Sequence, residues 1–274
     1  MAEQKRFVIG PMAAAVAMLV ALALAAPPAA GAPHLGSLKR AVARAEAAHP
    51  NALWHVVHGL CLRDMKASGN PAPCAKVDLA GRYAVVKDVE RKTQYLLVPT
   101  DHVAGIESPA LLAPDTPNYW QAAWLARGMI EQQLGRPIPR DQIGLAINSM
   151  TGRTQDQLHI HIDCVKPRIR KALAAAAPRL GPHWTRLTFG ADYDSYRARW
   201  MGDADLGASD PFKLLARTDA AARADMSREA LALIPATRPD GVRGFVLLAD
   251  RTDDSHDAAA EELLDHKCLV LQAP

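Results

Sequence analysis

The chain has 274 residues, of which 49% are hydrophobic, and this is enough for one large domain or two small domains with a sizeable buried core. Its 32 basic and 29 acidic residues leave a net charge of only +3. That balance argues against a nucleic-acid-binding protein and is compatible with an anionic small-molecule or lipid substrate. The sequence has no internal repeat of solenoid period, so the composition favours a globular enzyme or binding protein.

The first 32 residues are expected to be an export signal rather than part of the folded domain. Lys5 and Arg6 precede an almost wholly apolar stretch over residues 7–26, which a Pro- and Ala-rich run follows. An apolar stretch of about twenty residues can just span a bilayer, so we expect a retained single-span anchor. Cleavage after Ala32 is the alternative, because Ala30 and Ala32 form a small-x-small pattern. Positive residues before the span predict that the bulk of the chain lies outside the cytoplasm.

Four cysteines, an even number in an exported chain, predict two disulfides. Cys61 and Cys74 flank a turn-rich loop over residues 63–73, so a local bridge is the expected pairing. A bridge between Cys164 and Cys268 would tie the C-terminus to the core, with two buried free thiols as the alternative. No CxxC spacing supports zinc binding or thioredoxin-type chemistry.

Hydrophobic periodicity and start and stop signals predict an α+β fold up to about residue 177. Thr116-Pro117 before an amphipathic stretch and Gly135 after it are typical of the beginning and end of a helix. The predicted elements are a helix capped by Ser37 over 38–48, a helix over 53–58, a hairpin over 82–87 and 93–99, a helix over 118–134, strands over 143–148 and 155–164, and a helix over 168–177. This order favours antiparallel hairpins over parallel crossovers.

The remainder of the chain is less regular. We expect a strand over 184–189, helices over 211–217 and 227–233, a buried strand over 244–249, a helix within the acidic stretch 253–265 and a short strand over 268–271. These elements could complete the same sheet or form a second, smaller lobe, and the sequence does not decide between the two.

Residues 155–164 carry the pattern that organises the interpretation of the chain. In a β-strand, successive side chains point to opposite faces. One face of this strand would carry Leu158, Ile160, Ile162 and Cys164, and the other His159, His161 and Asp163. Two imidazoles and a carboxylate along one face favour a functional site over a solvated or purely structural surface.

These side chains suit chemistry on phosphorus. A neutral imidazole held by a hydrogen bond at one ring nitrogen can attack with the other. The turn just upstream contains Gly152, Arg153 and Thr154, which can aim backbone N–H groups, a charge and a hydroxyl at phosphate oxygens. His102 follows a strand of the same antiparallel region and is expected to converge on the site. No P-loop or dinucleotide-binding glycine pattern competes with this interpretation.

Several motifs give the chain a family resemblance. Leu97-Val98-Pro99-x-x-His102, then Ala146-Ile147-Asn148, then Gln155-x-x-x-His159-x-His161, is similar in order and spacing to the histidine-triad superfamily of nucleotide hydrolases and transferases. More narrowly, the chain resembles the bacterial CDP-diacylglycerol pyrophosphatase family in its apolar N-terminal segment, in Gly152-Arg153-Thr154-Gln155 and in the Asp210-Pro211-Phe212 of a long C-terminal extension.

The resemblance implies an α+β domain over residues 33–274, with an antiparallel sheet flanked by helices. A histidine-triad-like catalytic core would span about residues 80–180, and the C-terminal extension about residues 181–274. The implied reaction is hydrolysis of the pyrophosphate bond of CDP-diacylglycerol to phosphatidate and CMP, without a cofactor or a metal. The implied location is the bacterial inner membrane, with the catalytic domain in the periplasm and a lipid-linked nucleotide as its partner.

The resemblance also implies a role for each residue of the motif. His161 would attack the α-phosphorus and form a nucleotidyl-histidine, which water then hydrolyses. His159 would orient and polarise the site, and His102 would support the nucleophile or contact the nucleotide. Asn148 and Gln155 would hold phosphate oxygens.

Asp163 departs from the family pattern, because many members have a third histidine at this position. A carboxylate beside a phosphate is unfavourable unless it pairs with a cation, for which His159 and Arg153 are the candidates. As an alternative hypothesis, Asp163 raises the pKa of a neighbouring imidazole and keeps that ring protonated for the leaving group.

Other functions are compatible with the same residues. The covalent histidine would also serve a nucleotidyl transferase or a hydrolase of soluble nucleotide esters. In a different class, His102, His159, His161 and Asp163 would be the ligands of an exported metal-binding protein, because His-x-His on a strand is a known zinc geometry. A basic cluster over residues 166–179 is interpreted as a solvated helix face, with contact to an anionic membrane surface as the alternative.

Overall fold

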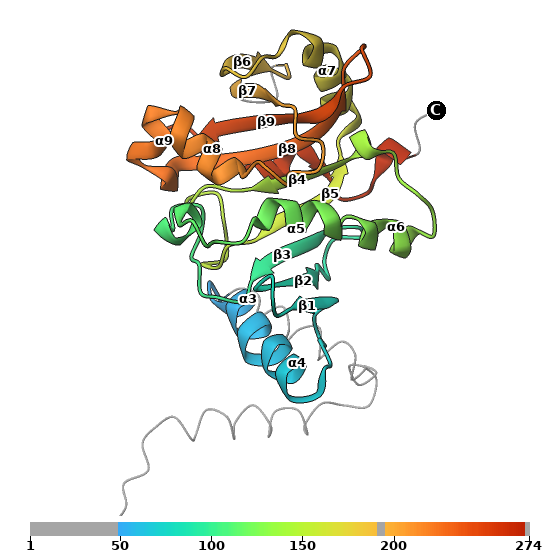
Figure 1. Ribbon diagram of the computed structural model, residues 1–274, viewed down its shortest axis with the longest axis vertical. Helices are drawn as coiled ribbons and strands as arrows, with labels where there is room; N and C mark the ends of the chain where they lie inside the picture. The colour runs from blue at the N-terminus through green and yellow to red at the C-terminus, as the bar shows by residue number, and fades with distance from the viewer. Residues whose placement is uncertain (1–48, 191–194, 272–274) are drawn as a thin grey trace, which may run out of the picture. The chain divides into compact units, whose positions relative to one another are not determined.

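One antiparallel sheet organises the part of the chain that this computed structural model describes, residues 49–190 and 195–271. Its strands lie side by side in the order β1-β2-β3-β5-β4-β8-β9-β7-β6, and β10 pairs with the end of β5 (Figure 1). The strands are β1 (Lys76–Asp78), β2 (Tyr83–Lys87), β3 (Tyr95–Pro99), β4 (Ile143–Ile147), β5 (Ile160–Val165), β6 (Thr185–Thr188), β7 (Ser195–Met201), β8 (Glu229–Thr237), β9 (Arg243–Arg251) and β10 (Leu264–Asp265).

Short helices connect these strands and cover both faces of the sheet. They are α3 (Ala52–Trp54), the π-helix η1 (His55–Leu62), α4 (Arg63–Ser68), α5 (Tyr119–Ala126), α6 (Gly128–Leu134), α7 (Pro167–Ala176), α8 (Pro211–Thr218) and α9 (Ala220–Ala224), with 3₁₀ turns η2 (Pro109–Leu112), η3 (Arg140–Gln142), η4 (Ala177–Arg179), η5 (Met226–Arg228), η6 (Ala260–Leu263) and η7 (Leu269–Leu271).

The predicted α+β class with an antiparallel sheet flanked by helices is confirmed. The hairpin of β2 and β3 forms as expected, with Val85 opposite Leu97. The C-terminal part of the chain completes the same sheet, because Leu233 of β8 lies opposite Leu145 of β4. Of the two arrangements that the sequence left open, the structure has the single continuous sheet.

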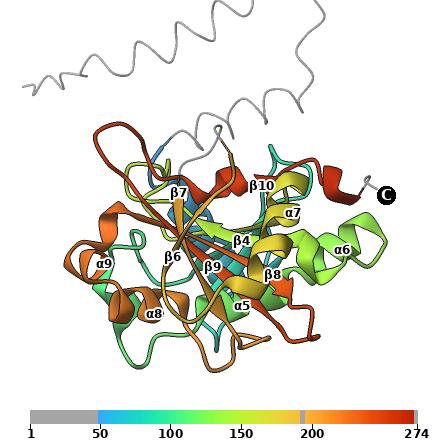
Figure 2. The ribbon, with the colours of Figure 1, turned by 90° about the horizontal axis from the view of Figure 1, so that it is seen from above.

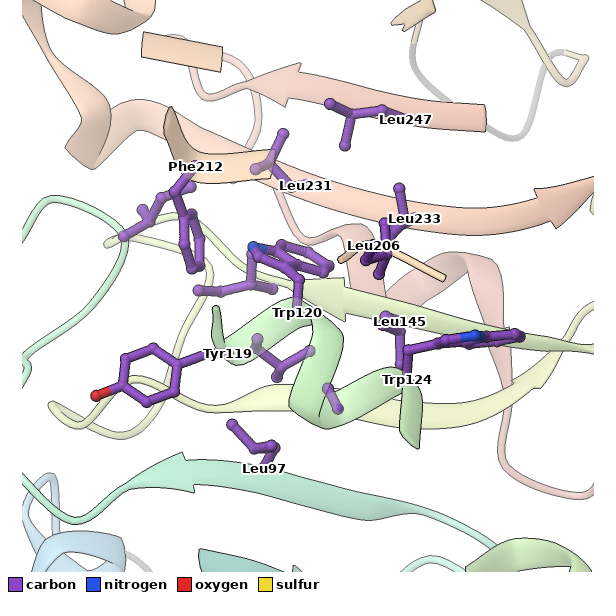
Figure 3. Packing of buried hydrophobic residues seen from close by; sticks show 14 of the residues in the cluster. Leu97, Tyr119, Trp120, Trp124, Leu145, Leu206, Phe212, Leu231, Leu233 and Leu247 are labelled. Carbon is purple, nitrogen blue, oxygen red and sulfur yellow. The ribbon is translucent and has the colours of Figure 1, made fainter. Parts of the chain in front are cut away.

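The larger core lies on the face of the sheet that α5 and α8 cover (Figure 2). The side chain of Asn118 accepts a hydrogen bond from the backbone N–H of Gln121, so Asn118, rather than Thr116, caps α5. The rings of Trp120 and Phe212 lie 5.3 Å apart between their centroids over the buried leucines of the strands (Figure 3). Aromatic side chains bury large apolar areas, so these contacts fix the two helices on the sheet.

The opposite face carries two smaller apolar clusters. One joins η1 to the end of the sheet at β2 and β3, and the other joins α7 and η6 to β4, β8 and β9. His161 of β5 lies opposite Leu96 of β3 on one side and Ala146 of β4 on the other, and directly opposite residues share a face. The row of histidines therefore lies between the two clusters.

The helix predicted over 227–233 is wrong, because this segment begins strand β8. Alanine and leucine favour helices in isolation, but packing overrides that weak preference. Both faces of β8 are buried, with Leu231 and Leu233 in the larger core and Ala230 and Ala232 in the cluster under α7. A strand buried on both faces has a continuous apolar sequence, which cannot be told from a buried helix by its pattern.

Other boundaries also differ from the predictions. Residues 63–68 form helix α4 instead of a loop, continuing the predicted helix over 53–58. The regular strand β5 begins only at Ile160, and the acidic stretch contains the short turn η6. The expected strand over 268–271 is the 3₁₀ turn η7. Prediction was least accurate near the C-terminus, where contacts with distant strands decide the conformation.

The two predicted disulfides are both present. Cys61 of η1 bonds to Cys74, and Cys164 of β5 bonds to Cys268. The second bridge fastens the C-terminal segment to the central strand.

The predicted export signal and the helix over 38–48 lie outside the described residues. Within residues 49–190 and 195–271, no helix combines the length and apolar character needed to cross a membrane.

Candidate active site

His159 and His161 lie in the middle of the sheet, buried and close together. His161 belongs to β5 and His159 immediately precedes that strand, and only 8% of His159 and 6% of His161 is exposed. The rings meet edge to face with 4.9 Å between their centroids. The alternation predicted from the sequence therefore places both imidazoles on one face, as expected.

The two ring nitrogens of His161 differ, because Nδ1 contacts other side chains and Nε2 has no hydrogen-bond partner among the described residues. Its Nδ1 lies 3.1 Å from a carboxylate oxygen of Glu261 and also contacts the side-chain amide of Gln94. Its Nε2 is buried and has no hydrogen-bond partner among the described residues. A buried polar atom without a partner is uncommon in folded proteins, and a catalytic role is one of its explanations. The open Nε2 is the atom expected to react.

Burial lowers the pKa of both imidazoles. For His161 the pKa falls well below the ordinary value, because burial disfavours the charged ring and the neighbouring His159, His266 and Arg91 repel a further positive charge. For His159 burial also dominates, opposed by a 2.7 Å hydrogen bond between its Nδ1 and the backbone carbonyl of Gln157. Both rings are therefore neutral near pH 7, which is the nucleophilic form.

Asp163 is completely buried beside the disulfide and makes contacts that the sequence did not indicate. One carboxylate oxygen accepts hydrogen bonds from the Thr93 hydroxyl (2.6 Å) and the Cys164 backbone N–H (2.8 Å). The other lies 2.8 Å from Nδ1 of His266. Asp163 thus pairs with neither of the cations proposed for it, and the imidazole next to it is that of His266.

The loop between β2 and β3 supplies Thr93 and Gln94, and a lysine holds this loop in place. The ammonium group of Lys87 donates hydrogen bonds to the backbone carbonyls of Asp88 (2.7 Å), Arg91 (2.7 Å) and Gln94 (3.1 Å). One side chain thus closes the loop over the sheet. Burial lowers the pKa of the Lys87 ammonium group.

Asn148 connects the end of β4 to η6. Its side-chain oxygen accepts a hydrogen bond from the backbone N–H of Glu261 (3.2 Å), and its side-chain nitrogen donates to the carbonyl of Gly152 (3.3 Å). A Cβ at Gly152 would lie 2.4 Å from the carbonyl oxygen of Ala258, so only glycine allows this approach. Asn148 is therefore connected to His161 through Glu261, whose backbone N–H it binds and whose carboxylate lies against the ring.

The other predicted phosphate contacts are occupied or peripheral. Arg153 forms a two-point ion pair with Glu107, at 2.7 and 2.8 Å. The side chain of Gln155 accepts from the backbone N–H of Leu53 and donates to the carbonyl of His49. Thr154 is exposed. For Arg153 to bind phosphate, its pair with Glu107 would have to open.

His102 lies in a separate aromatic group. Its ring meets Trp54 edge to face at 5.0 Å, and Trp54 stacks on His58 at 4.3 Å. The buried side chain of Gln157 joins this region to the approach to β5, because it donates to the carbonyls of Pro99 and Asp101. His102 is exposed, and its ring packs on Trp54 rather than on His159 or His161.

The proposed metal ligands do not gather in the described residues. The one group of three or more possible ligand atoms there consists of Asp163, Cys164 and Cys268. The two sulfurs are bonded to each other, so they are not available as thiolate ligands.

Sequence reasoning missed four residues that contact the predicted row: Thr93, Gln94, Glu261 and His266. The sequence predicts an ordinary strand for Thr93 and Gln94, it places Glu261 in the acidic stretch 253–265 that is expected to contain a helix, and it assigns His266 to no element. Thr93 and Gln94 stand out because they are buried polar residues, but their burial is known only from the structure. No sequence signal linked Glu261 or His266 to β5.

A buried, neutral imidazole with one open nitrogen is typical of enzymes that use histidine as a nucleophile or base. Residues 48–272 match the family model described as CDP-diacylglycerol pyrophosphatase. A CDP-diacylglycerol pyrophosphatase from Yersinia pestis is 41% identical over 223 residues, which cover 81% of this chain and 85% of the relative. The chain belongs to the CDP-diacylglycerol pyrophosphatase family, as predicted from its motifs.

Among solved structures, a HIT family hydrolase from Clostridium thermocellum is 19% identical, with a TM-score of 0.27; the match covers 38% of this chain and 88% of that one.

Proposed function

We propose that this chain hydrolyses the pyrophosphate bond of CDP-diacylglycerol to give phosphatidate and CMP. Family membership and the relative from Yersinia pestis support the substrate and the reaction. The observation in the site that carries the proposal is the open Nε2 of the neutral, buried His161.

The proposed reaction has two steps on a histidine-triad-like core. Nε2 of His161 forms a bond to the α-phosphorus as the bond from that phosphorus to the bridging oxygen breaks, and phosphatidate leaves with the electron pair. Water then attacks the nucleotidyl-histidine, the P–N bond breaks and CMP leaves. His159 orients and polarises the site, and Asn148 holds the segment that carries Glu261.

Phosphate binding by Arg153, Thr154 and Gln155, and nucleotide contact by His102, are also part of the proposal. The aromatic group of Trp54 and His102 offers a surface on which a base could stack, which favours nucleotide contact over direct support of His161 for this residue. Asp163 is proposed to act through His266 rather than on phosphate, because both of its carboxylate oxygens are engaged.

We further propose that the enzyme works at the periplasmic face of the bacterial inner membrane. The apolar stretch at residues 7–26 supports an anchor, and a lipid-linked substrate requires access to a membrane surface. Two disulfides support an oxidising compartment, because such bonds are rare in the cytosol.

The test is CMP release by the full chain from CDP-diacylglycerol in detergent micelles, with a chelator present. We expect His161→Ala to abolish CMP release, since no other group replaces its nucleophile. His183→Ala, at an exposed histidine before β6, is the matched control and should retain activity.

Three other outcomes would contradict the proposal. Turnover of soluble nucleotide esters without CMP release from the lipid would keep the histidine chemistry and reject the substrate. Loss of activity with chelator would favour a metal site. No turnover of either substrate class would favour a binding protein.

A further inference from the structure

The C-terminal extension delivers a carboxylate to the proposed nucleophile. Glu261 belongs to η6, whose buried residues Ala260 and Leu263 pack in the cluster under α7. The Asn148 side chain accepts the backbone N–H of Glu261, and a β-bridge joins Asn148 to Ala259 just before it. The carboxylate is thereby held against His161 by a fixed backbone, although 32% of its side chain remains exposed.

The position of the Nδ1 proton decides whether His161 can attack through Nε2. A neutral imidazole has one N–H and one lone pair, and the partner at one nitrogen selects which nitrogen is protonated. A carboxylate only accepts hydrogen bonds, so Glu261 favours a proton on Nδ1 and leaves the lone pair on Nε2. If an amide N–H of Gln94 donated to Nδ1 instead, the proton would move to Nε2 and block the attack.

Gln94 and Glu261 therefore have different effects on the same atom. In the structure the amide nitrogen of Gln94 is the atom nearest Nδ1, but the amide can turn over and present its oxygen instead, so Gln94 accommodates both tautomers. The charge on Glu261 distinguishes them. His266, the other nearby ionisable group from the extension, is engaged by Asp163.

We propose that Glu261 is a positioning residue that accepts the Nδ1 hydrogen bond of His161 and selects the tautomer with its lone pair on Nε2. This inference rests on the proposed function. When Nε2 bonds to phosphorus, the ring becomes a cationic nucleotidyl-imidazolium and retains its Nδ1 proton. The adjacent carboxylate stabilises that charge until water attacks phosphorus, the P–N bond breaks and the lone pair returns to Nε2. A carboxylate supports the histidine of a serine protease in a similar way.

Kinetics of Glu261 variants test this role on the full chain. We expect Glu261→Ala to lower kcat about 100-fold with little change in KM, because the interaction strengthens as charge develops on the ring. Glu261→Gln keeps an acceptor without the charge and should lose less. Sodium formate should partly restore Glu261→Ala, since the site of the carboxylate is accessible to small anions.

The matched control is the next residue, Glu262. Its carboxylate accepts a hydrogen bond from the Tyr196 hydroxyl at 2.7 Å, away from His161, on the same 3₁₀ turn. Glu262→Gln should leave kcat within about threefold of the unmodified enzyme. If the two positions gave equal losses, Glu261 would be acting only through the stability of η6, and the inference would be rejected.

Nitrogen-15 NMR of the imidazoles separates this inference from the proposed function. In the unmodified protein His161 should show a protonated Nδ1 and an unprotonated Nε2, and Glu261→Ala should shift this ratio toward the other tautomer. An unchanged ratio would overturn the inference even if the enzyme were active. Absence of CMP release with a Glu261-dependent ratio would reject the reaction but keep the positioning role.

Discussion

At the scale of single residues, burial shifts the pKa values of the histidines and of the carboxylate in the site. His159 and His161 are neutral because transfer of an imidazolium into the sheet is costly, whereas burial raises the pKa of Glu261 above its ordinary value. Positive charge from His266 and Arg91 opposes that rise. The pKa of the proposed nucleophile and that of its carboxylate are therefore shifted in opposite directions.

These shifts predict how activity and stability depend on pH. Activity should fall on the acid side as the His161 ring becomes protonated, with an apparent pKa below the ordinary histidine value of 6.5, because burial lowers the pKa of this imidazole. Lowered imidazole pKa values stabilise the fold above about pH 6.5, and this contribution is lost as the pH falls through the lowered values. The measurements are kcat/KM and Tm from pH 4 to 8; an acid limb above 6.5 would contradict the prediction.

At the scale of elements, the loop between β2 and β3 contributes a cation that Arg153 does not supply. Arg91 is exposed, and its charge is felt by both His161 and Glu261. Its backbone carbonyl is fixed by Lys87, so the loop keeps the guanidinium near the site. A pyrophosphate approaching the open Nε2 would meet this positive group.

We predict that Arg91→Ala raises KM for CDP-diacylglycerol about fivefold and weakens the salt dependence of kcat/KM. An exposed charge that attracts an anionic substrate contributes about 1 kcal/mol and is screened by added salt. Lys92→Ala is the matched control, because Lys92 is the next exposed cation on the same loop. Equal effects of the two substitutions would indicate general attraction by the loop rather than a specific contact of Arg91.

Local patterns and distant contacts explain what the sequence could predict. The alternation around His161 and the hairpin of β2 and β3 depend on neighbouring residues, so they were predictable. The contact of Gln94 with His161 joins residues 67 apart, and that of His266 with Asp163 joins residues 103 apart. Such contacts arise only when the strands pair, and no property of the acidic stretch distinguishes Glu261 from Glu262 in advance. The same limit applies to β8, because the local sequence of its first residues predicts a helix and only its pairing with β4 and β9 makes it a strand.

At the scale of the whole molecule, the C-terminal segment is attached to β5, the strand that carries the proposed nucleophile. β10 pairs with the end of β5, so that Asp265 lies opposite Cys164. The disulfide to Cys268 follows within three residues, and His266 lies between these two attachments against Asp163. Loss of this connection should therefore affect both stability and the geometry around His161.

We predict that Cys164→Ala/Cys268→Ala lowers both Tm and kcat, and more strongly than Cys61→Ala/Cys74→Ala. The Cys164–Cys268 bridge closes a sequence separation of 104 residues and the Cys61–Cys74 bridge only 13. In the chain-entropy model this is a difference of about 2 kcal/mol in the free energy of unfolding. Only the Cys164–Cys268 bridge anchors the segment that carries Glu261 and His266. Thermal unfolding and CMP release, each measured with and without a reductant, provide the test. If the variant without the Cys164–Cys268 bridge had a lower Tm but kept full kcat below that Tm, β10 and η6 would be shown to hold Glu261 in place without the disulfide.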